Sequence, residues 1–472
     1  MKLITLDFLL KATGGQALAT AQTQFSGIGT DSRSDLRNQI FIALVGETFD
    51  GHAFLEGAIA GGAAALLIHD RSKMEKLPSG ITVVLVQDTL LAMQKLAQAV
   101  RRQSPALLIG LTGSNGKTTT KEFMASLFGG FRSVHYSKGS FNNHWGVPMT
   151  LLQLESQHEI GIIEMGMNHA GELTELVRVA EPDVVLCTMV GRAHIEHFGS
   201  VEKIAEAKEE IYEAANPEAT RIYNLDDEWV SQMHRRAHQR FPKARVMTFS
   251  SDQEAAADVN LNLVKVGMRA MTVEGRIGGQ RGSAEVQVFG TQNLVNLMAA
   301  ATAGLAAGLS PDQIWKGLTS CKTSWGRNQF VKLRSGAEMI FDAYNANPDS
   351  MAALLGNMKL VQTRGRKVGV FGQMLELGSD SAHFHEEIAS QAAGSGFDQI
   401  FFIGADEAAF LRGLKKAGFT GVIHSGRDYS AQMGQELASF LRPDDVVVVK
   451  GSRGTKLERF VEPCDPLDFG KK

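Results

Sequence analysis

Residues 112–120, with the sequence TGSNGKTTT, combine residue types that together can bind phosphate. Two glycines allow the backbone to curl closely around an anion, and the lysine after them can reach the terminal phosphates of a nucleotide. The hydroxyl group of the next threonine can bind Mg²⁺. We therefore expect ATP or GTP binding through Gly113, Ser114, Asn115, Gly116, Lys117, Thr118 and Thr119.

The sequence on either side of this segment predicts the elements that a phosphate loop needs. The apolar run ALLIGLTG predicts a buried strand before it, and KTTTKEFMASLF predicts a helix after it. The start of a helix offers an anion free backbone N–H groups and the positive end of a dipole. The loop is shorter than the usual pattern, because Leu111 stands where glycine is expected five residues before Gly116.

Length and composition narrow the possible classes of protein. A chain of 472 residues is too long for one hydrophobic core, and 44% apolar with 21% charged residues is typical of globular proteins. A net charge of −3 argues against nucleic-acid binding. The sequence shows neither a membrane-spanning run nor the apolar core of a secretion signal, and Cys187, Cys321 and Cys464 are too far apart to suggest disulfides. We expect a cytoplasmic protein.

The alternation of strands and helices predicts an α/β fold with mostly parallel sheets in three domains. Residues 1–88 are expected to form a small α/β domain, and residues 89–319 the domain that contains the phosphate loop. The β-rich texture near 258–288 predicts an antiparallel excursion within this second domain. Residues 320–472 are expected to form a Rossmann-like domain, without the G-x-G-x-x-G pattern that would indicate a dinucleotide.

Three side chains outside the loop are candidates for metal chemistry. Glu164 ends the strand IGIIE, and His194 follows the strand VVLCTMV, so both should lie at the edge where parallel sheets bind ligands. Each also has an ordinary explanation, as a polar strand end or a solvated histidine. Lys208 falls on the apolar stripe of the helix SVEKIAEAKEEIYEAA, where it either extends along the helix surface to solvent or is a buried amine open to carbamylation.

The chain resembles the Mur ligases, which assemble cell-wall peptides, over nearly its whole length. TGSNGKTTT resembles the phosphate loop of that family, including its short spacing. SKGSFNNHWGVPMTLL, EMGMNHAGE and AHIEHFGS with AKEEI resemble its asparagine-rich, metal and lysine motifs. YNANPDSM, FGQMLELG and VKGSRG are typical of the branch that adds D-alanyl-D-alanine, and the Asp-Asn-Pro-Arg motif of the branch that adds the third amino acid is absent.

This resemblance implies roles for particular residues. Glu164 and His194 would bind Mg²⁺ beside Thr118, and Lys208 would be carbamylated near the same metal. The nucleotide would be contacted by Asn293, Asn296, Arg327 and Asp342, and the catalytic set would be Lys117, His194, Lys208 and Arg327. The substrate-binding residues would be Thr30, Asp31, Ser32, Arg33, Asn142, Asn143, Asn345, Asn347 and Lys450.

The expected reaction joins D-alanyl-D-alanine to UDP-N-acetylmuramoyl-tripeptide through an acyl phosphate, with ATP and Mg²⁺. We expect a monomer in which the third domain closes over the second and brings Arg327 and Asp342 to the nucleotide. Three departures from the family pattern, at Met165, Met167 and Gln373, affect substrate contacts rather than the reaction class. The alternatives are another amide ligase, such as a sister Mur ligase or folylpolyglutamate synthetase, and a nucleotide-gated binding protein.

Overall fold

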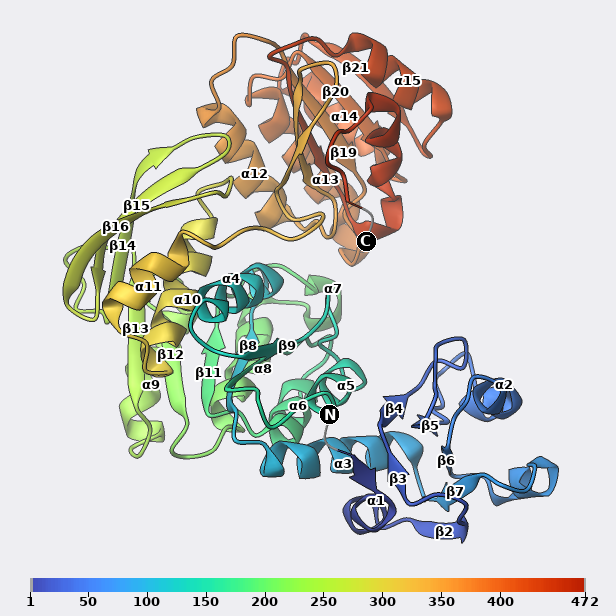
Figure 1. Ribbon diagram of the computed structural model, residues 1–472. Helices are drawn as coiled ribbons and strands as arrows, with labels where there is room; N and C mark the ends of the chain where they lie inside the picture. The colour runs from blue at the N-terminus through green and yellow to red at the C-terminus, as the bar shows by residue number, and fades with distance from the viewer. Residues whose placement is uncertain (1–2, 471–472) are drawn as a thin grey trace. The chain divides into compact units, whose positions relative to one another are not determined.

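The computed structural model describes residues 3–470 as an α/β protein built on three main sheets (Figure 1). The first of two compact units contains residues 1–111, 132–185 and 211–219, and the second contains residues 112–131, 186–210 and 220–472. The predicted fold class is confirmed, whereas the division into domains at 88 and 319 stays a prediction. Within residues 3–470, no helix combines the length and the apolar character that crossing a membrane requires.

A five-stranded sheet with the order β2-β7-β6-β5-β4 organises the amino-terminal part of the first unit. Its strands run parallel, except that β2 pairs antiparallel with β7 at one edge. Side chains alternate across β5, so that Ile40 and Ile42 pack with α1 and α3 while Phe41 packs with α2. The elements are β1 Ile4–Thr5, α1 Leu6–Thr13, β2 Gln16–Ala19, β3 Gln24–Phe25, β4 Gly27–Gly29, β5 Gln39–Ile42, η1 Gly51–Phe54, α2 Leu55–Ala60, β6 Ala65–Ile68, η2 Arg71–Lys76, β7 Thr82–Leu85 and α3 Thr89–Gln103.

A nine-stranded sheet follows, with the order β16-β15-β14-β13-β12-β11-β8-β10-β9. Strand β8 leads directly into the phosphate loop and helix α4, as predicted. Strands β14, β15 and β16 pair antiparallel, which confirms the predicted excursion. The elements are β8 Leu107–Thr112, α4 Lys117–Gly129, β9 Val134–Tyr136, α5 Gly146–Leu151, β10 Ile160–Glu164, α6 Glu172–Ala180, β11 Val184–Cys187, α7 Ile195–Phe198, α8 Val201–Glu213, β12 Thr220–Asn224, α9 Glu228–Arg240, β13 Val246–Ser250, β14 Val259–Val266, β15 Met271–Ile277, β16 Gln280–Val286, α10 Asn293–Ala306 and α11 Pro311–Leu318.

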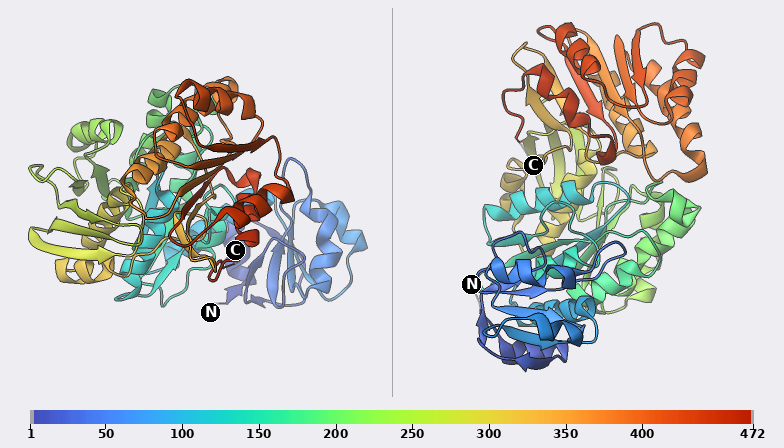
Figure 2. Two further views of the ribbon diagram at one scale, coloured as in Figure 1. Left: turned by 90° about the horizontal axis from the view of Figure 1, so that it is seen from above. Right: turned by 90° about the vertical axis from the view of Figure 1, so that its right-hand side faces the viewer.

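The carboxyl-terminal part of the second unit contains a six-stranded sheet with the order β17-β18-β22-β19-β20-β21. Only the edge strand β17 is antiparallel to its neighbour. Val446 and Val448 face one apolar cluster, and Val447 and Val449 face another, because helices cover both faces (Figure 2). The elements are β17 Gln329–Lys332, β18 Glu338–Asp342, α12 Pro348–Leu360, β19 Lys367–Gly372, η3 Gly378–Asp380, α13 Ser381–Ala393, β20 Gln399–Ile403, α14 Glu407–Lys416, β21 Val422–Gly426, α15 Ala431–Phe440, β22 Val446–Lys450, η4 Arg453–Thr455, η5 Leu457–Phe460 and η6 Glu462–Cys464.

Cys187, Cys321 and Cys464 are each buried, and none of the three forms a disulfide. Burial raises the pKa of each thiol to about 12, so these side chains behave as small apolar groups.

Candidate active site

The two glycines of the phosphate loop occupy positions that no other residue type fits. Gly113 has a φ of 150°, and a Cβ atom there would lie 1.9 Å from the Thr188 hydroxyl oxygen. Gly116 has a φ of 84°, and a Cβ atom there would lie 2.3 Å from Asn296 Oδ1. The loop therefore follows a tight course that depends on glycine. This confirms the structural reason for which the two glycines were singled out.

The start of α4 has the properties of an anion site. Gly116 is its N-cap, and because glycine has no side chain it makes no side-chain cap hydrogen bond to the first turn. Lys117 folds back over the loop, where its Nζ atom donates to the Gly113 carbonyl oxygen at 2.5 Å. Thr118 and Thr119 follow on the same first turn and are buried. The loop thus has donors and a cation where a nucleotide phosphate would bind.

The loop is braced by residues 188–191, a segment distant in sequence. The Ser114 hydroxyl donates to the Gly191 carbonyl oxygen at 3.0 Å and accepts from the Gly191 N–H at 2.8 Å. The Thr188 hydroxyl group donates to the Asn115 carbonyl oxygen at 2.6 Å. These contacts constrain the backbone of the loop, and such constraint favours ligand binding.

Asn293 and Asn296 lie in the first turns of α10, and both are buried. The Thr120 hydroxyl donates to Asn296 Oδ1 at 3.0 Å, and Asn296 Nδ2 donates to Asn293 Oδ1 at 2.9 Å. Asn293 Nδ2 in turn donates to the Phe289 carbonyl oxygen at 2.7 Å. The two amides therefore support the phosphate loop and α4, and their predicted contact with the nucleotide stays a prediction.

Lys208 points inward from α8, as the apolar stripe predicted, and only 2% of its surface is exposed. This burial excludes the alternative in which the side chain extends along the helix to solvent. Removal from water, and then the charge of Lys117, lowers the pKa of Lys208 to about 7. A substantial fraction of this amine is consequently uncharged near neutral pH.

His194 follows β11 in the second unit, and its partner was not predicted from the sequence. Its Nδ1 atom lies 2.8 Å from Glu376 Oε2, in the segment between β19 and α13. Contact with His194 lowers the pKa of Glu376. Both residues have a positive φ, 63° and 62°, which is unusual for side chains other than glycine and indicates positions fixed by their surroundings. The FGQMLELG motif contains Glu376, but nothing local in it predicts the histidine contact.

Glu164 belongs to the first unit, where it ends β10 with only 1% of its surface exposed. Asn142 Nδ2 donates to Glu164 Oε1 at 2.9 Å. Asn143, the next residue, accepts from the Trp145 and Gly146 N–H groups through its Oδ1 atom, just before α5. The structure therefore joins the asparagine-rich segment to this carboxylate.

The predicted metal set Thr118, Glu164, His194 and Lys208 stays a prediction. Across residues 3–470, no group of three or more His, Cys, Asp or Glu side chains is arranged to hold a metal ion.

Several predicted residues gather at the carboxyl ends of β18 and β22. Asp342 and Lys450 are direct partners in the parallel register. Lys450 Nζ donates to Asp342 Oδ2 at 2.6 Å and to the Asn345 carbonyl oxygen at 3.1 Å, and it is buried. The Arg327 guanidinium lies over the Tyr344 ring, 4.5 Å from its centre. This edge thus pairs the Asp342 carboxylate with the buried Lys450 side chain, while Arg327 lies over the Tyr344 ring.

Asn347 connects this carboxyl-terminal sheet to the phosphate loop. It is the N-cap of α12, and its Nδ2 atom donates to Asn115 Oδ1 at 2.9 Å. The structure therefore brings together two residues that were assigned separately, Asn115 to the nucleotide and Asn347 to the substrate. Asp349, two residues further on, was not predicted to have a role.

The segment 30–33 lies on the surface of the first unit. Arg33 Nε and Nη2 donate to the two oxygens of Asp31, each at 2.8 Å. This hydrogen-bonded arginine lowers the pKa of Asp31 to about 2. Thr30 is half-buried, and Ser32 lies beside Gly57. The exposed polar groups of this segment suit a polar ligand.

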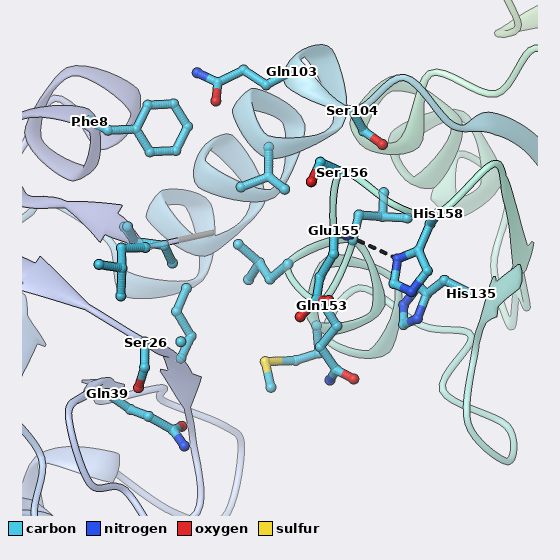
Figure 3. Close-up of a pocket in the computed structure, with 18 of the residues that line it drawn as sticks. Phe8, Ser26, Gln39, Gln103, Ser104, His135, Gln153, Glu155, Ser156 and His158 are labelled. Carbon is cyan, nitrogen blue, oxygen red and sulfur yellow. Dashed lines mark hydrogen bonds between the residues drawn. The ribbon is translucent and has the colours of Figure 1, made fainter. Parts of the chain in front are cut away.

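A cavity of about 840 Å³ in the first unit lies apart from these residues (Figure 3). Phe8 of α1, Ser104 after α3, and His135 and His158 are among its lining residues. The two imidazole rings stack with their centres 5.1 Å apart, and burial lowers the pKa of His135. Among the described residues that line the cavity, none belongs to the predicted site.

Comparison with known proteins assigns the family. Residues 24–101 match the Mur ligase family catalytic domain, residues 111–304 the Mur ligase middle domain, and residues 326–453 the Mur ligase glutamate ligase domain. The UDP-N-acetylmuramoyl-tripeptide–D-alanyl-D-alanine ligase of Bacillus subtilis is 36% identical over 93% of each chain. MurF from Acinetobacter baumannii superposes with a TM-score of 0.86 at 28% identity over 98% of each chain. MurF ligase from Thermotoga maritima, solved in complex with ADP, gives a TM-score of 0.77 at 26% identity, over 93% of this chain and 96% of that one. The chain therefore belongs to the Mur ligase family.

Proposed function

We propose that the protein is an ATP-dependent, ADP-forming ligase that joins D-alanyl-D-alanine to UDP-N-acetylmuramoyl-tripeptide, giving the pentapeptide precursor of peptidoglycan. The observation that carries the proposal is the glycine-dependent phosphate loop. It occurs in a chain that is similar, over 93% of its length, to a UDP-N-acetylmuramoyl-tripeptide–D-alanyl-D-alanine ligase. The geometry of the loop supports a nucleotide phosphate as the source of the phosphoryl group. The relatives, one of them solved with ADP, support ATP and the identity of the acid and the amine.

The reaction needs an activated acid, because a carboxylate is a poor acceptor for an amine. The terminal carboxylate of the tripeptide attacks the γ-phosphorus of ATP, ADP leaves, and an acyl phosphate forms. The amine of D-alanyl-D-alanine then attacks the acyl carbon and loses a proton, and the tetrahedral intermediate expels phosphate. Lys117 would leave the Gly113 carbonyl oxygen to contact the γ-phosphate, and Arg327 would neutralise charge as it transfers.

We also propose that the reaction depends on Mg²⁺. Thr118, Glu164 and His194 offer oxygen and nitrogen ligands, and Glu164 is a buried carboxylate at a strand end. Bound Mg²⁺ would neutralise the negative charge of the phosphates and hold them for in-line transfer. Lys208 suits carbamylation, because a buried amine with a pKa of about 7 is partly uncharged near neutral pH. The uncharged amine can add carbon dioxide and lose a proton to give a carbamate. The resulting anion would help to hold the metal.

The remaining residues are proposed to bind the other parts of the nucleotide and of the two substrates. Asn293, Asn296 and Asp342 would lie on the adenosine side of the nucleotide. The segment 30–33 would bind the UDP part of the substrate, and Asn142, Asn143, Asn345, Asn347 and Lys450 would bind its peptide and the dipeptide. We propose that the protein acts in the cytoplasm as a monomer, where its three buried cysteines would stay reduced.

The test is phosphate release from ATP in the presence of UDP-N-acetylmuramoyl-tripeptide. D-alanyl-D-alanine, meso-diaminopimelate, L-alanine and glutamate are added in separate reactions. Release only with D-alanyl-D-alanine, together with a product of the added mass, is expected. Release that requires another amine would indicate a sister ligase, and release indifferent to every amine would indicate a nucleotide-gated binding protein.

A further inference from the structure

The carboxylate of Asp349, in the first turn of α12, is bound to the loop that supports the phosphate site. Asp349 Oδ2 accepts from the Arg192 backbone N–H at 2.7 Å, and Asp349 Oδ1 accepts from Arg192 Nε at 2.8 Å. The approach is close, since a Cβ atom on Gly191 would lie 2.6 Å from Asp349 Oδ2. One carboxylate therefore fixes both the backbone and the side chain of the loop.

The same loop holds the phosphate loop through its backbone. Gly191 exchanges two hydrogen bonds with the Ser114 hydroxyl group, and the Ser114 N–H donates to the Met189 carbonyl oxygen at 2.9 Å. A continuous series of contacts consequently runs from Asp349 through residues 191–192 to Ser114. Only residues 191–192 separate Asp349 from the phosphate loop in this series, so a displacement of Asp349 would also displace the loop.

A second contact from α12 reaches the next residue of the phosphate loop. Asn347 Nδ2 donates to Asn115 Oδ1, and Asn115 Nδ2 lies 3.4 Å from Asn347 Oδ1. Asn347 and Ser350 form a capping box around Pro348, which makes this turn stiff. Asn347 and Asp349 therefore lie on the same capped turn and reach the phosphate loop by two routes. Asn347 contacts Asn115 directly, and Asp349 reaches Ser114 through residues 191–192.

Arg192 is held from the carboxyl-terminal side as well. Its guanidinium lies 5.4 Å from the centre of the Phe384 ring in α13, in addition to its pairing with Asp349. Residues 189–192 thus contact the phosphate loop on one side and helices α12 and α13 on the other.

We propose that Asp349 is a positioning residue for ATP binding, which acts through Arg192 and Gly191 to hold the phosphate loop in its binding shape. Residues 345–350, which we assign to the substrates, and the phosphate loop would then take up their binding conformations together. ATP binding would therefore also position the residues that bind the acid and the amine. The link to turnover rests on the proposed ligase activity, whereas the link to ATP binding does not.

The experiment measures the Kd of ATP for the full chain by calorimetry in the presence of Mg²⁺, without the other substrates. Asp349→Ala and Arg192→Ala are each expected to weaken binding about tenfold, equivalent to about 1.4 kcal/mol. Because Asp349→Ala already removes both hydrogen bonds to Arg192, the double variant should bind ATP no more weakly than Asp349→Ala alone. Asp349→Asn, which keeps an oxygen for the Arg192 N–H, should retain part of the affinity.

Asp465→Ala is the matched control, because it also removes a carboxylate paired with an arginine, Arg334, but on the exposed surface. It should leave the Kd unchanged, and the unfolding temperatures of all variants should stay close to that of the wild type. An unchanged or tighter Kd in Asp349→Ala, or losses that multiply in the double variant, would overturn the proposal. In turnover, the variant should raise KM for ATP more than KM for D-alanyl-D-alanine.

The two proposals fail in different ways. A wrong ligase assignment appears as wild-type protein that releases no phosphate with D-alanyl-D-alanine. A wrong role for Asp349 appears as unaltered ATP affinity in the variants, whatever the acceptor of the reaction.

Discussion

Asn296 Oδ1 occupies the space that a β-carbon on Gly116 would need, at a distance of only 2.3 Å. The asparagine is held there by Thr120 and Asn293, so it has little freedom to move aside. The shape of the phosphate loop is therefore determined by a side chain on α10 as much as by the loop itself.

Gly116→Ala is expected to weaken ATP binding by about 100-fold or more, because a positive φ and a collision with Asn296 both oppose alanine. Calorimetric titration with ATP measures the effect. Gly129→Ala is the control on the same helix, since a Cβ atom there meets nothing within 4 Å. Comparable affinity in both variants would contradict this account of the loop.

Lys208→Ala is expected to lose phosphate release by about 100-fold or more, because the variant lacks the amine that would carry the carbamate. Added bicarbonate should not restore the activity, since carbon dioxide then has no amine to modify. Lys203→Ala, an exposed lysine on the same helix, should retain wild-type turnover. Wild-type turnover in Lys208→Ala would exclude the carbamate.

The buried amine of Lys208 should also make stability depend on pH. In the unfolded chain this lysine keeps its proton up to about pH 10.5, whereas in the folded chain it loses the proton above about pH 7. Between these two pH values the unfolded state binds more protons than the folded state, so the contribution of Lys208 to the free energy of unfolding rises with pH. Lys208→Met should therefore stabilise the fold most below pH 7 and progressively less toward pH 10.

Chemical denaturation of the wild type and Lys208→Met at pH 6 and pH 9, in buffer free of carbon dioxide, measures this difference. The omission of carbon dioxide keeps the wild-type amine unmodified. A difference in unfolding free energy that is the same at both pH values would show that the lysine is not desolvated as the structure indicates.

Asp342→Asn is expected to destabilise the fold by about 3 kcal/mol, because it leaves the buried Lys450 cation without its charged partner. The double variant Asp342→Asn with Lys450→Met should be less destabilised than the single one, since no unpaired charge remains. Urea unfolding without nucleotide separates this effect from any role in catalysis. Asp465→Asn, in an exposed pair with Arg334, should change the unfolding free energy by less than about 1 kcal/mol.

Local sequence was sufficient for the parts of the site that depend on one element. The strand, glycine turn and helix around Lys117 were predicted from their periodicity. The position of Lys208 on the apolar stripe of its helix was predicted in the same way, whereas its burial was one of two alternatives that only the structure decided. Glu164 was placed correctly at a strand end for the same reason. In each case a repeated pattern over several residues determines which way the side chain points.

Contacts between distant segments could not be predicted in this way. Arg192 and Asp349 are 157 residues apart, and neither lies in a pattern that distinguishes it from a surface charge. The pairing of His194 with Glu376 is similar, since it depends on two unusual backbone conformations. The short strands β1 to β4 were also missed, because two to four residues carry too little periodicity to be recognised.

The bracing of the phosphate loop affects when a newly made chain can first bind nucleotide. A ribosome that has added residue 120 has made the whole loop but none of its supports. Thr188 lies 73 residues beyond Asn115, Gly191 lies 77 beyond Ser114, and Asn347 lies 232 beyond Asn115. The bracing of the loop is therefore complete only once residue 347 has been added, and a chain that stops before Asn347 would lack one of the three anchors of its phosphate loop.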